Sequence, residues 1–452
     1  MPKPAPSPAR APEEVDMFTY YLGLGFRSLR RNPVLTILMV LTLSVGVAAS
    51  MTTLTLLHGM SGNPIPGKSD RLFVPLLDNG PGEELDGSGE PPRQVSHTDA
   101  VNLWDQAKGA LQTPLYGIGP AIDSGRADLP PFFSSGVAVG RDFFAMFDVP
   151  FLHGQAWSAD DDRRGAAVVV IGRELSERVF GAGVNAVGQT IRISDVDYQV
   201  IGVVDTWNPV PKFYRLIGNS SFSESEDVYM PFRTAVNREL QVNGSIDCSS
   251  ESGPGFQGLV ASECVWIQYW VELESASKRQ EYADYLNAYI NEQKALGRYT
   301  RPVNFRLYDV MEWLDFNEVV SDDTRTSTWL AFAFLLVCLV NTVGLLLAKF
   351  SARPGEIGVR RALGATRRDV FTQYLTEAGV IGLVGAGVGL GLTFGALAYI
   401  RALDESIALV TRIDGAMLGT AVALSIAASL LAGLLPTWRA CQVVPALQLK
   451  SQ

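Results

Sequence analysis

Residues 34–57 read VLTILMVLTLSVGVAASMTTLTLL, a run of 24 residues without a charged side chain. As an α-helix this run would be about 36 Å long, which exceeds a hydrocarbon core of about 30 Å. Three further uncharged apolar runs lie at 329–348, 378–400 and 416–436. The sequence therefore predicts four transmembrane helices, with a long insertion between the first and the other three. A cleaved signal peptide is the alternative for the first run, but its apolar stretch would span only about 7–15 residues.

The charges divide the chain into two parts. Hydrophobic residues make up 47% of the sequence and charged residues 19%, against about 25% charged in soluble domains. Residues 59–327 hold 22 Lys and Arg against 38 Asp and Glu, a net charge of −16, whereas the remainder has a net charge of +6. This separation indicates two compartments and argues against nucleic-acid binding. Four cysteines and three histidines are too few for a dense disulfide scaffold or a zinc module.

Basic residues give the expected orientation, because Lys and Arg accumulate at the cytoplasmic ends of spans. Arg27, Arg30 and Arg31 lie just before the first span, six basic residues lie between the second and third, and two follow the fourth. The 401–415 loop has two arginines offset by three acidic residues. Both termini, the 349–377 segment and the 437–452 tail are therefore expected in the cytoplasm. Residues 58–308 and the 401–415 loop are expected outside.

The N-terminal segment divides at Met17. Residues 1–16 are rich in Pro and Ala and are predicted to form a disordered cytoplasmic tail. Apolar residues of the 17–33 segment share one helical face, with its arginines mostly off that face. This pattern is typical of an amphipathic helix lying in the membrane interface. The alternative is a simple flank of the first span that sets topology.

The 58–308 insertion mixes strand and helix patterns and predicts a large α+β domain with room for two subdomains. Strands are expected at 71–76, 136–139, 166–171 and 265–274, a hairpin at 190–193 with 198–204, and helices at 96–110, 172–180 and 276–296. Helical spacing then resumes at Asp309 and predicts a stalk helix over 309–328 that leads into the second span. One helix is expected from Asp309 to Phe350; the alternative is a break near residues 321–323.

Cys248 and Cys264 are the only cysteines of the insertion, and they bracket a Gly- and Ser-rich loop of 15 residues. An oxidising compartment favours a disulfide between them, which would contribute about 3 kcal/mol in the entropic model. The alternative is two unpaired thiols. Cys338 lies inside the second span and Cys441 in the tail, so neither can readily reach the other pair.

Catalytic and metal-binding motifs are weak in this sequence. The sequence has no G-x-S-x-G, H-E-x-x-H or C-x-x-C pattern. His58, His97 and His153 are interpreted as surface or packed histidines, and Asp160–Asp162 as a solvated turn. The Gly-rich stretch at 382–392 lies in an apolar span, where Gly387, Gly391 and Gly395 have the small-xxx-small spacing of close helix packing.

The 349–377 cytoplasmic segment is the strongest local signal. Its residues 351–377 read SARPGEIGVRRALGATRRDVFTQYLTE. Gly364 interrupts the helical pattern, and Arg367 and Arg368 begin the helix that becomes the third span. A short basic helix of this kind can insert into a cleft on a cytoplasmic partner. The alternative is a topology signal in contact with anionic membrane lipid.

The chain resembles the MacB/FtsX-type ABC transporter permeases. EIGVRRALGATRRDVFTQYLTEAGVIGLVGAGVGLGL (356–392) is similar to their cytoplasmic signature. The segment from VAVGRDFFAMFDVPF to DYQVIGVV (137–204) resembles the MacB-like periplasmic core domain, and DVYMPF (227–232) a later strand of it. The order of one span, a large domain and three spans also matches. The resemblance is weakest over 208–263.

This resemblance implies a function and partners. The expected fold is a membrane protein of four transmembrane α-helices (1 + 3) with a large α+β periplasmic domain, in the bacterial inner membrane. The permease would dimerise with a second copy or a paralogue and bind two copies of a separate ABC ATPase. ATP and magnesium would be held by that ATPase, with no catalytic, metal or cofactor site in this chain. The coupling residues would be Glu356, Arg360, Arg361, Leu363, Gly364, Ala365, Arg367 and Arg368.

The same family suggests the output. Transmission of ATP-driven motion to the periplasmic domain would serve efflux or extrusion, with a periplasmic adaptor and an outer-membrane duct as further partners. The alternative is a membrane-anchored regulator that activates a periplasmic enzyme such as a cell-wall hydrolase, or a lipoprotein extractor.

Overall fold

The computed structural model describes residues 23, 32–80, 89–351, 359, 363–403, 408–411 and 415–442. Apart from isolated positions, the expectations for 1–16 and 17–33 lie outside the described residues. The chain divides into two compact units: residues 1–59 with 321–452, here called the membrane unit, and residues 60–320, called the inserted unit. This division agrees with an insertion between the first span and the rest.

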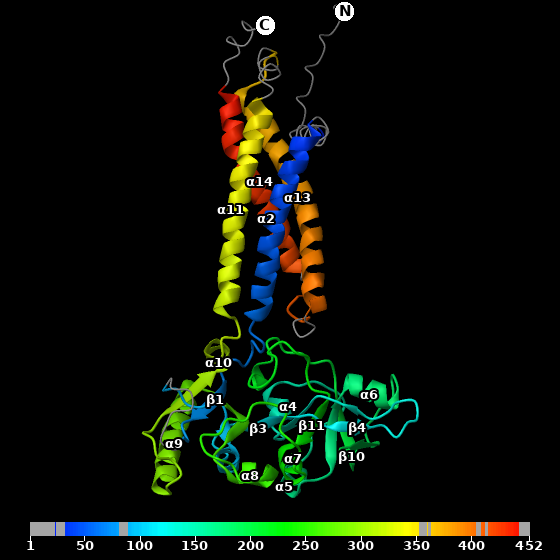
Figure 1. The fold of residues 1–452 in the computed structure, drawn as a ribbon, viewed down its shortest axis with the longest axis vertical. Coiled ribbons are helices and arrows are strands. Elements are labelled where there is room, and N and C mark those ends of the chain that lie inside the picture. Colours follow the sequence, from blue (N-terminus) through cyan, green and yellow to red (C-terminus); the bar gives the residue numbers. More distant parts are fainter. Residues whose placement is uncertain are drawn as a thin grey trace, which may run out of the picture. The chain divides into compact units, whose positions relative to one another are not determined.

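In the described residues, the membrane unit contains four long apolar helices (Figure 1). They are α2 Pro33–Met60, α11 Asp322–Ser351, α13 Arg367–Leu403 and α14 Gly415–Cys441. Each is long and apolar enough to cross a membrane. The helices extend beyond the uncharged runs of the sequence: α13 begins 11 residues earlier and is about 55 Å long at 1.5 Å per residue.

Buried serines join these helices. The Ser44 hydroxyl donates to the Gly385 carbonyl at 3.0 Å, and the Ser425 hydroxyl donates to the Gly382 carbonyl at 3.0 Å. Ser50 donates to the Ala331 carbonyl at 3.1 Å. Apolar surface gives little drive for association between helices in lipid, so close packing and such hydrogen bonds stabilise the bundle.

One mixed sheet forms the centre of the inserted unit. Its strands are β1 Leu72–Leu77, β2 Val95–Ser96, β3 Leu111–Ile118, β4 Ala121–Asp123, β5 Phe132–Phe133, β6 Gly136–Val139, β7 Phe151–Gly154, β8 Val168–Gly172, β9 Thr190–Ile193, β10 Val196–Val204, β11 Val228–Pro231, β12 Val265–Glu272 and β13 Phe305–Asp309. The main path runs β13-β1-β12-β3-β6-β11-β8-β10-β9-β4-β5, with β2 on β12 and β7 on β10. The β11–β6 and β10–β8 pairs are parallel. A single sheet therefore joins regions for which two subdomains had been considered.

Helices cover this sheet. They are α3 His97–Gln106, α4 Phe143–Met146, α5 Ala159–Arg164, α6 Arg173–Phe180, the 3-10 turn η1 Phe213–Arg215, α7 Phe232–Asn237, α8 Gly255–Ala261, α9 Ala276–Ala295 and α10 Val310–Phe316. The sheet separates two hydrophobic clusters, with Ile267, Tyr269 and Val271 of β12 in one and Trp270 in the other. All eight residues of β12 are buried. Both faces of this strand therefore lie in the core.

Local sequence signals place several elements correctly. Ser96 caps α3 by accepting from the Asp99 amide. The helix ends at Gln106 rather than at residue 110, because Ala107 adopts a left-handed conformation with φ of 48°. The 190–204 hairpin forms with a two-residue turn, in which Ser194 and Asp195 both have positive φ. Such a turn matches the twist of the paired strands.

The continuous helix expected from Asp309 to Phe350 is wrong. Asp309 and Glu312 form a capping box that begins α10, but this helix ends at Phe316. Glu318 has a positive φ of 51°, and α11 begins only at Asp322. A non-glycine residue in the left-handed region cannot continue a right-handed helix. The alternative of two helices therefore holds, with the break at residues 317–321.

The acidic run Asp160–Asp162 is not a solvated turn. Ser158 and Asp161 form a capping box that begins α5, and Gly165 ends this helix with φ of 64°. The Asp162 side chain is buried, and its carboxylate accepts from the Arg141 amide at 3.1 Å. The sequence showed three adjacent acids but not which one points inward.

Candidate coupling site and buried charge clusters

The structure describes five of the eight predicted coupling residues: Leu363, Gly364, Ala365, Arg367 and Arg368. Glu356, Arg360 and Arg361 lie outside the described residues.

The predicted coupling residues lie in the 349–377 segment, here called the coupling segment. Its described part contains the N-terminus of α13, which is capped. Gly364 has a backbone φ of 102°, a conformation that residues with a Cβ atom rarely adopt. Thr366 and Asp369 then cap α13, since the Asp369 carboxylate accepts from the Thr366 amide and the Asp369 amide donates to the Thr366 hydroxyl. Leu363 is 83% exposed, and Arg367 is also exposed. The site thus presents an apolar side chain beside cations on a fixed backbone.

A buried ion pair joins the two helices that flank this segment. Lys349, near the end of α11, lies 2.6 Å from Glu377 of α13, and both side chains are almost fully buried. The rings of Phe350 and Tyr374 pack beside them, with centroids 4.4 Å apart. Breaking such a pair leaves an uncompensated buried charge, which costs about 3–5 kcal/mol. This pair was not predicted from the sequence, because its partners are 28 residues apart on different helices.

The glycines predicted for close helix packing do not have that role within the chain. A Cβ at Gly387, Gly391 or Gly395 would meet no other heavy atom within 4 Å. Instead, a Cβ at Gly382 would lie 2.0 Å from the Ser429 hydroxyl oxygen, and one at Gly389 would lie 3.3 Å from the Ser44 carbonyl oxygen. The glycines that permit close approach therefore lie on the other face of α13. Spacing alone identifies a face of small residues but not the rotation of the helix.

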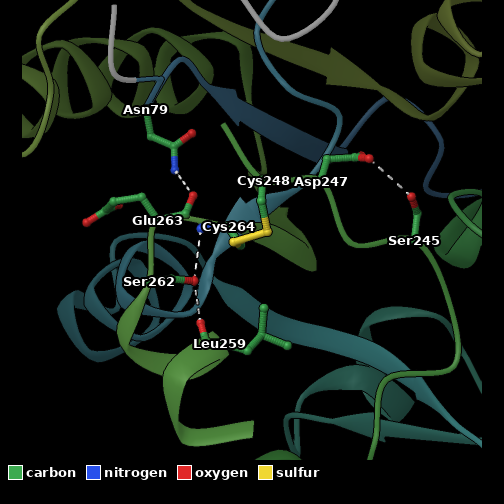
Figure 2. Close-up of a disulfide and its surroundings, with 8 residues drawn as sticks. All are labelled: Asn79, Ser245, Asp247, Cys248, Leu259, Ser262, Glu263 and Cys264. Atoms are coloured by element: carbon green, nitrogen blue, oxygen red, sulfur yellow. Dashed lines mark hydrogen bonds between the residues drawn. A yellow bond between two sulfur atoms is a disulfide. The ribbon is translucent and has the colours of Figure 1, made fainter. Parts of the chain in front are cut away.

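A disulfide joins Cys248 to Cys264, with their Cα atoms 4.3 Å apart (Figure 2). Asp247 and Val265 form a backbone bridge next to it. The Asn79 amide group donates to the Glu263 carbonyl at 3.0 Å. The disulfide thus fixes the 245–248 loop at the beginning of β12.

A second buried charge cluster lies in the inserted unit. The Glu226 carboxylate lies 2.9 Å from Arg215 and 3.2 Å from Lys212, and it accepts from the Tyr214 hydroxyl at 2.5 Å. Burial by itself raises the pKa of Glu226, but the two cations beside it hold that pKa below its usual value. Arg215 also donates to the Asn243 carbonyl at 2.6 Å. The cluster fixes the long loop before β11 to the loop after α7.

His97 has packing rather than ligand geometry. His97 stacks against Phe232 and Trp266, with ring centroids 6.1 and 6.3 Å away. Burial, followed by the charge of Arg233, lowers the pKa of His97. Within the described residues, no group of three or more His, Cys, Asp or Glu side chains could hold a metal ion.

Comparison with known proteins places these features in a family. Residues 36–289 match the MacB-like periplasmic core domain, and residues 329–445 match the FtsX-like permease C-terminal domain. The first match covers more than half of the chain. The chain therefore belongs to the MacB/FtsX-type permease family.

Individual relatives are distant. A probable export ATP-binding/permease protein MacB of Pseudomonas entomophila is 23% identical over 410 residues, covering 88% of this chain and 54% of the relative. The pyoverdine export ATP-binding/permease protein PvdT of the same species is 27% identical over 322 residues, covering 69% and 42%. The chain thus spans about half the length of these curated relatives. The crystal structure of the periplasmic region of MacB from Actinobacillus actinomycetemcomitans aligns with a TM-score of 0.35 and 16% identity, covering 54% of this chain and 92% of that one.

Proposed function

We propose that this chain is the permease subunit of an ABC transporter, which transmits the motion of a separate cytoplasmic ATPase to the inserted unit and thereby drives efflux or extrusion. Membership of the MacB/FtsX-type family and the names of the relatives, which combine ATP binding, permease and export, support this proposal. Both termini are placed in the cytoplasm and the inserted unit in the periplasm. A second permease copy, a periplasmic adaptor and an outer-membrane duct complete the proposed assembly.

The observation that carries the proposal is the capped, exposed start of α13. Leu363 offers apolar surface, and the exposed guanidinium groups of Arg367 and Arg368 offer donors for carboxylates on a partner. The Lys349–Glu377 pair ties α11 to α13 on either side of the coupling segment. A displacement of that segment would therefore move both helices together rather than bend one of them.

The test is to reverse the positive charges at the N-terminus of α13. Arg367→Glu with Arg368→Glu is introduced into the tagged full chain, and ABC ATPase that co-purifies from native membranes is quantified by mass spectrometry. Losing a charge partner at an interface costs about 2–5 kcal/mol, so we expect co-purification to fall at least tenfold.

The matched control is Arg163→Glu with Arg164→Glu, an adjacent pair of exposed arginines in α5 of the inserted unit. This control should retain the ATPase, and both variants should reach the membrane in normal yield. Undiminished ATPase recovery with the α13 variant would contradict the coupling role. Equal loss in both variants would attribute the effect to net charge instead.

A further inference from the structure

The inserted unit contains a cavity of about 760 Å³ that the coupling function does not use. Its walls come from residues 91–93, residues 216–221 and residues 245–248, with Asn317 after α10 completing the lining. Ligand pockets in proteins are typically about 300–1,000 Å³. The cavity is therefore large enough for a small organic molecule.

Two of the walls belong to residues 208–263, where the resemblance to the family is weakest. The chain brings these two stretches together from either side of β11. Loops on a rigid scaffold commonly carry binding residues. A cavity built mainly from this region is thus suited to a ligand particular to this chain.

Contacts within the chain hold these walls in place. Arg215 of η1 donates to the Asn243 carbonyl at 2.6 Å, and Gly218 lies so close to Ser245 that a Cβ there would be 2.2 Å from the Ser245 nitrogen. The Cys248–Cys264 disulfide, seen beside Asp247 and Ser245 in Figure 2, fixes the other end of the 245–248 wall. A preformed cavity loses little free energy to ordering when a ligand binds.

The cavity lining has an apolar part and a charged part. Leu216, Ile217 and Ile246 give an apolar wall, and Ile246 is 43% exposed although it is aliphatic. Arg93 is exposed, and its guanidinium lies 5.3 Å from the centre of the Phe316 ring. Among the described residues, no carboxylate lies within ion-pair distance of Arg93.

The acidic member of the lining is Asp247, whose carboxylate accepts from the Ser245 hydroxyl at 3.5 Å. Within the described part of the chain it forms no ion pair with Arg93, so no carboxylate there occupies the guanidinium donors that a ligand would use. A guanidinium suits carboxylate, sulfonate or phosphate groups because its planar donors can bind two oxygens at once.

We propose that this cavity is a binding site for a small amphipathic anion, with the anionic group on Arg93 and the apolar body against Leu216, Ile217 and Ile246. The site requires neither ATP nor an ATPase, so its test is independent of the coupling function. The Asp247 carboxylate would favour a ligand that also carries a hydroxyl or amine donor at its far end.

The test uses two probes that differ mainly in charge: 8-anilinonaphthalene-1-sulfonate and the uncharged N-phenyl-1-naphthylamine. Each is titrated by fluorescence into the full chain in phosphatidylcholine nanodiscs, with empty nanodiscs subtracted. Arg93→Gln is expected to weaken binding of the sulfonate about tenfold and to change binding of the uncharged probe less than about twofold. Arg93→Lys keeps the charge and should retain most of the sulfonate affinity.

Arg192→Gln is the matched control, because Arg192 is a half-exposed arginine of β9 that does not line the cavity. It should leave both probes unchanged. Sulfonate binding that is equal in wild type and Arg93→Gln would overturn the proposal, as would a wild-type signal no greater than that of empty nanodiscs. Equal weakening of both probes by Arg93→Gln would also overturn it, since the cavity would then not select an anion.

Discussion

Burial and charge conflict at Asp162, a residue of the inserted unit. It lies in the first turn of α5 with its side chain buried. Burial raises the pKa of this carboxyl from 3.8 to about 6, against the opposing effect of the Arg141 amide that donates to it. The folded protein therefore binds a proton here more tightly than the unfolded chain does.

The sign and size of the effect on stability follow from linkage. Between about pH 4 and pH 6 the folded state holds more protons than the unfolded state, so the free energy of unfolding falls as the pH rises. Above pH 6 the full penalty is present, and a pKa raised from 3.8 to about 6 corresponds to about 3 kcal/mol. At pH 4.5 only about 1 kcal/mol of that penalty is present.

Asp162→Asn removes the titrating group while keeping an oxygen for the Arg141 amide. We expect the variant to be more stable than the wild type at pH 8, by about 2 kcal/mol more than at pH 4.5. For a domain of this size, such a difference corresponds to a rise of roughly 4–8 °C in the unfolding temperature.

The assay is thermal unfolding of the inserted unit within the full chain in nanodiscs, followed by circular dichroism at both pH values. Asp160→Asn is the control, since Asp160 lies in the same helix turn but is 69% exposed. The Asp160→Asn variant measures how much an acid at the N-terminal end of α5 contributes through the helix dipole, without the burial of its carboxylate. A stability gain for Asp162→Asn that is the same at pH 4.5 and pH 8 would refute the reasoning.

Three further predictions concern the buried pairs and the topology. Lys349→Met should lower the stability of the membrane unit by about 3–5 kcal/mol, whereas adding Glu377→Leu should recover much of the loss. The test is to heat each variant in detergent and measure the remaining monodisperse protein; equal losses in the single and double variants would exclude a coupled pair. Glu226→Gln leaves two buried cations without a counter-charge and should cost a similar amount, measured as a lower unfolding temperature of the inserted unit; an unchanged temperature would mean that the cluster contributes little. In a background without other reactive cysteines, Ser277→Cys should react with an impermeant maleimide from outside and Ala365→Cys only from the cytoplasm, and the reverse pattern would contradict the orientation.

Much of the fold could be predicted because its signals are local. The uncharged run at 34–57 is long enough to cross a bilayer whatever surrounds it. The Ser96 cap and the 190–204 hairpin likewise depend on neighbouring residues only, and both form. The prediction of one helix from Asp309 to Phe350 was wrong. The apolar spacing continues across residues 317–321, but the helical backbone conformation is interrupted there.

The candidate sites divide in the same way. Four spans, the insertion between the first and second, the basic 349–377 segment and the cysteines available for a disulfide could be read from the sequence, because length, charge and composition are visible along the chain. Other features appear only once the chain is folded: Lys349 pairs with Glu377, Gly382 and Gly389 rather than Gly387 face neighbouring helices, and Glu226 lies beside two cations. These contacts depend on how each helix is rotated and on which distant segments meet. Both are determined by the packing free energy of the whole unit, which cannot be read from neighbouring residues.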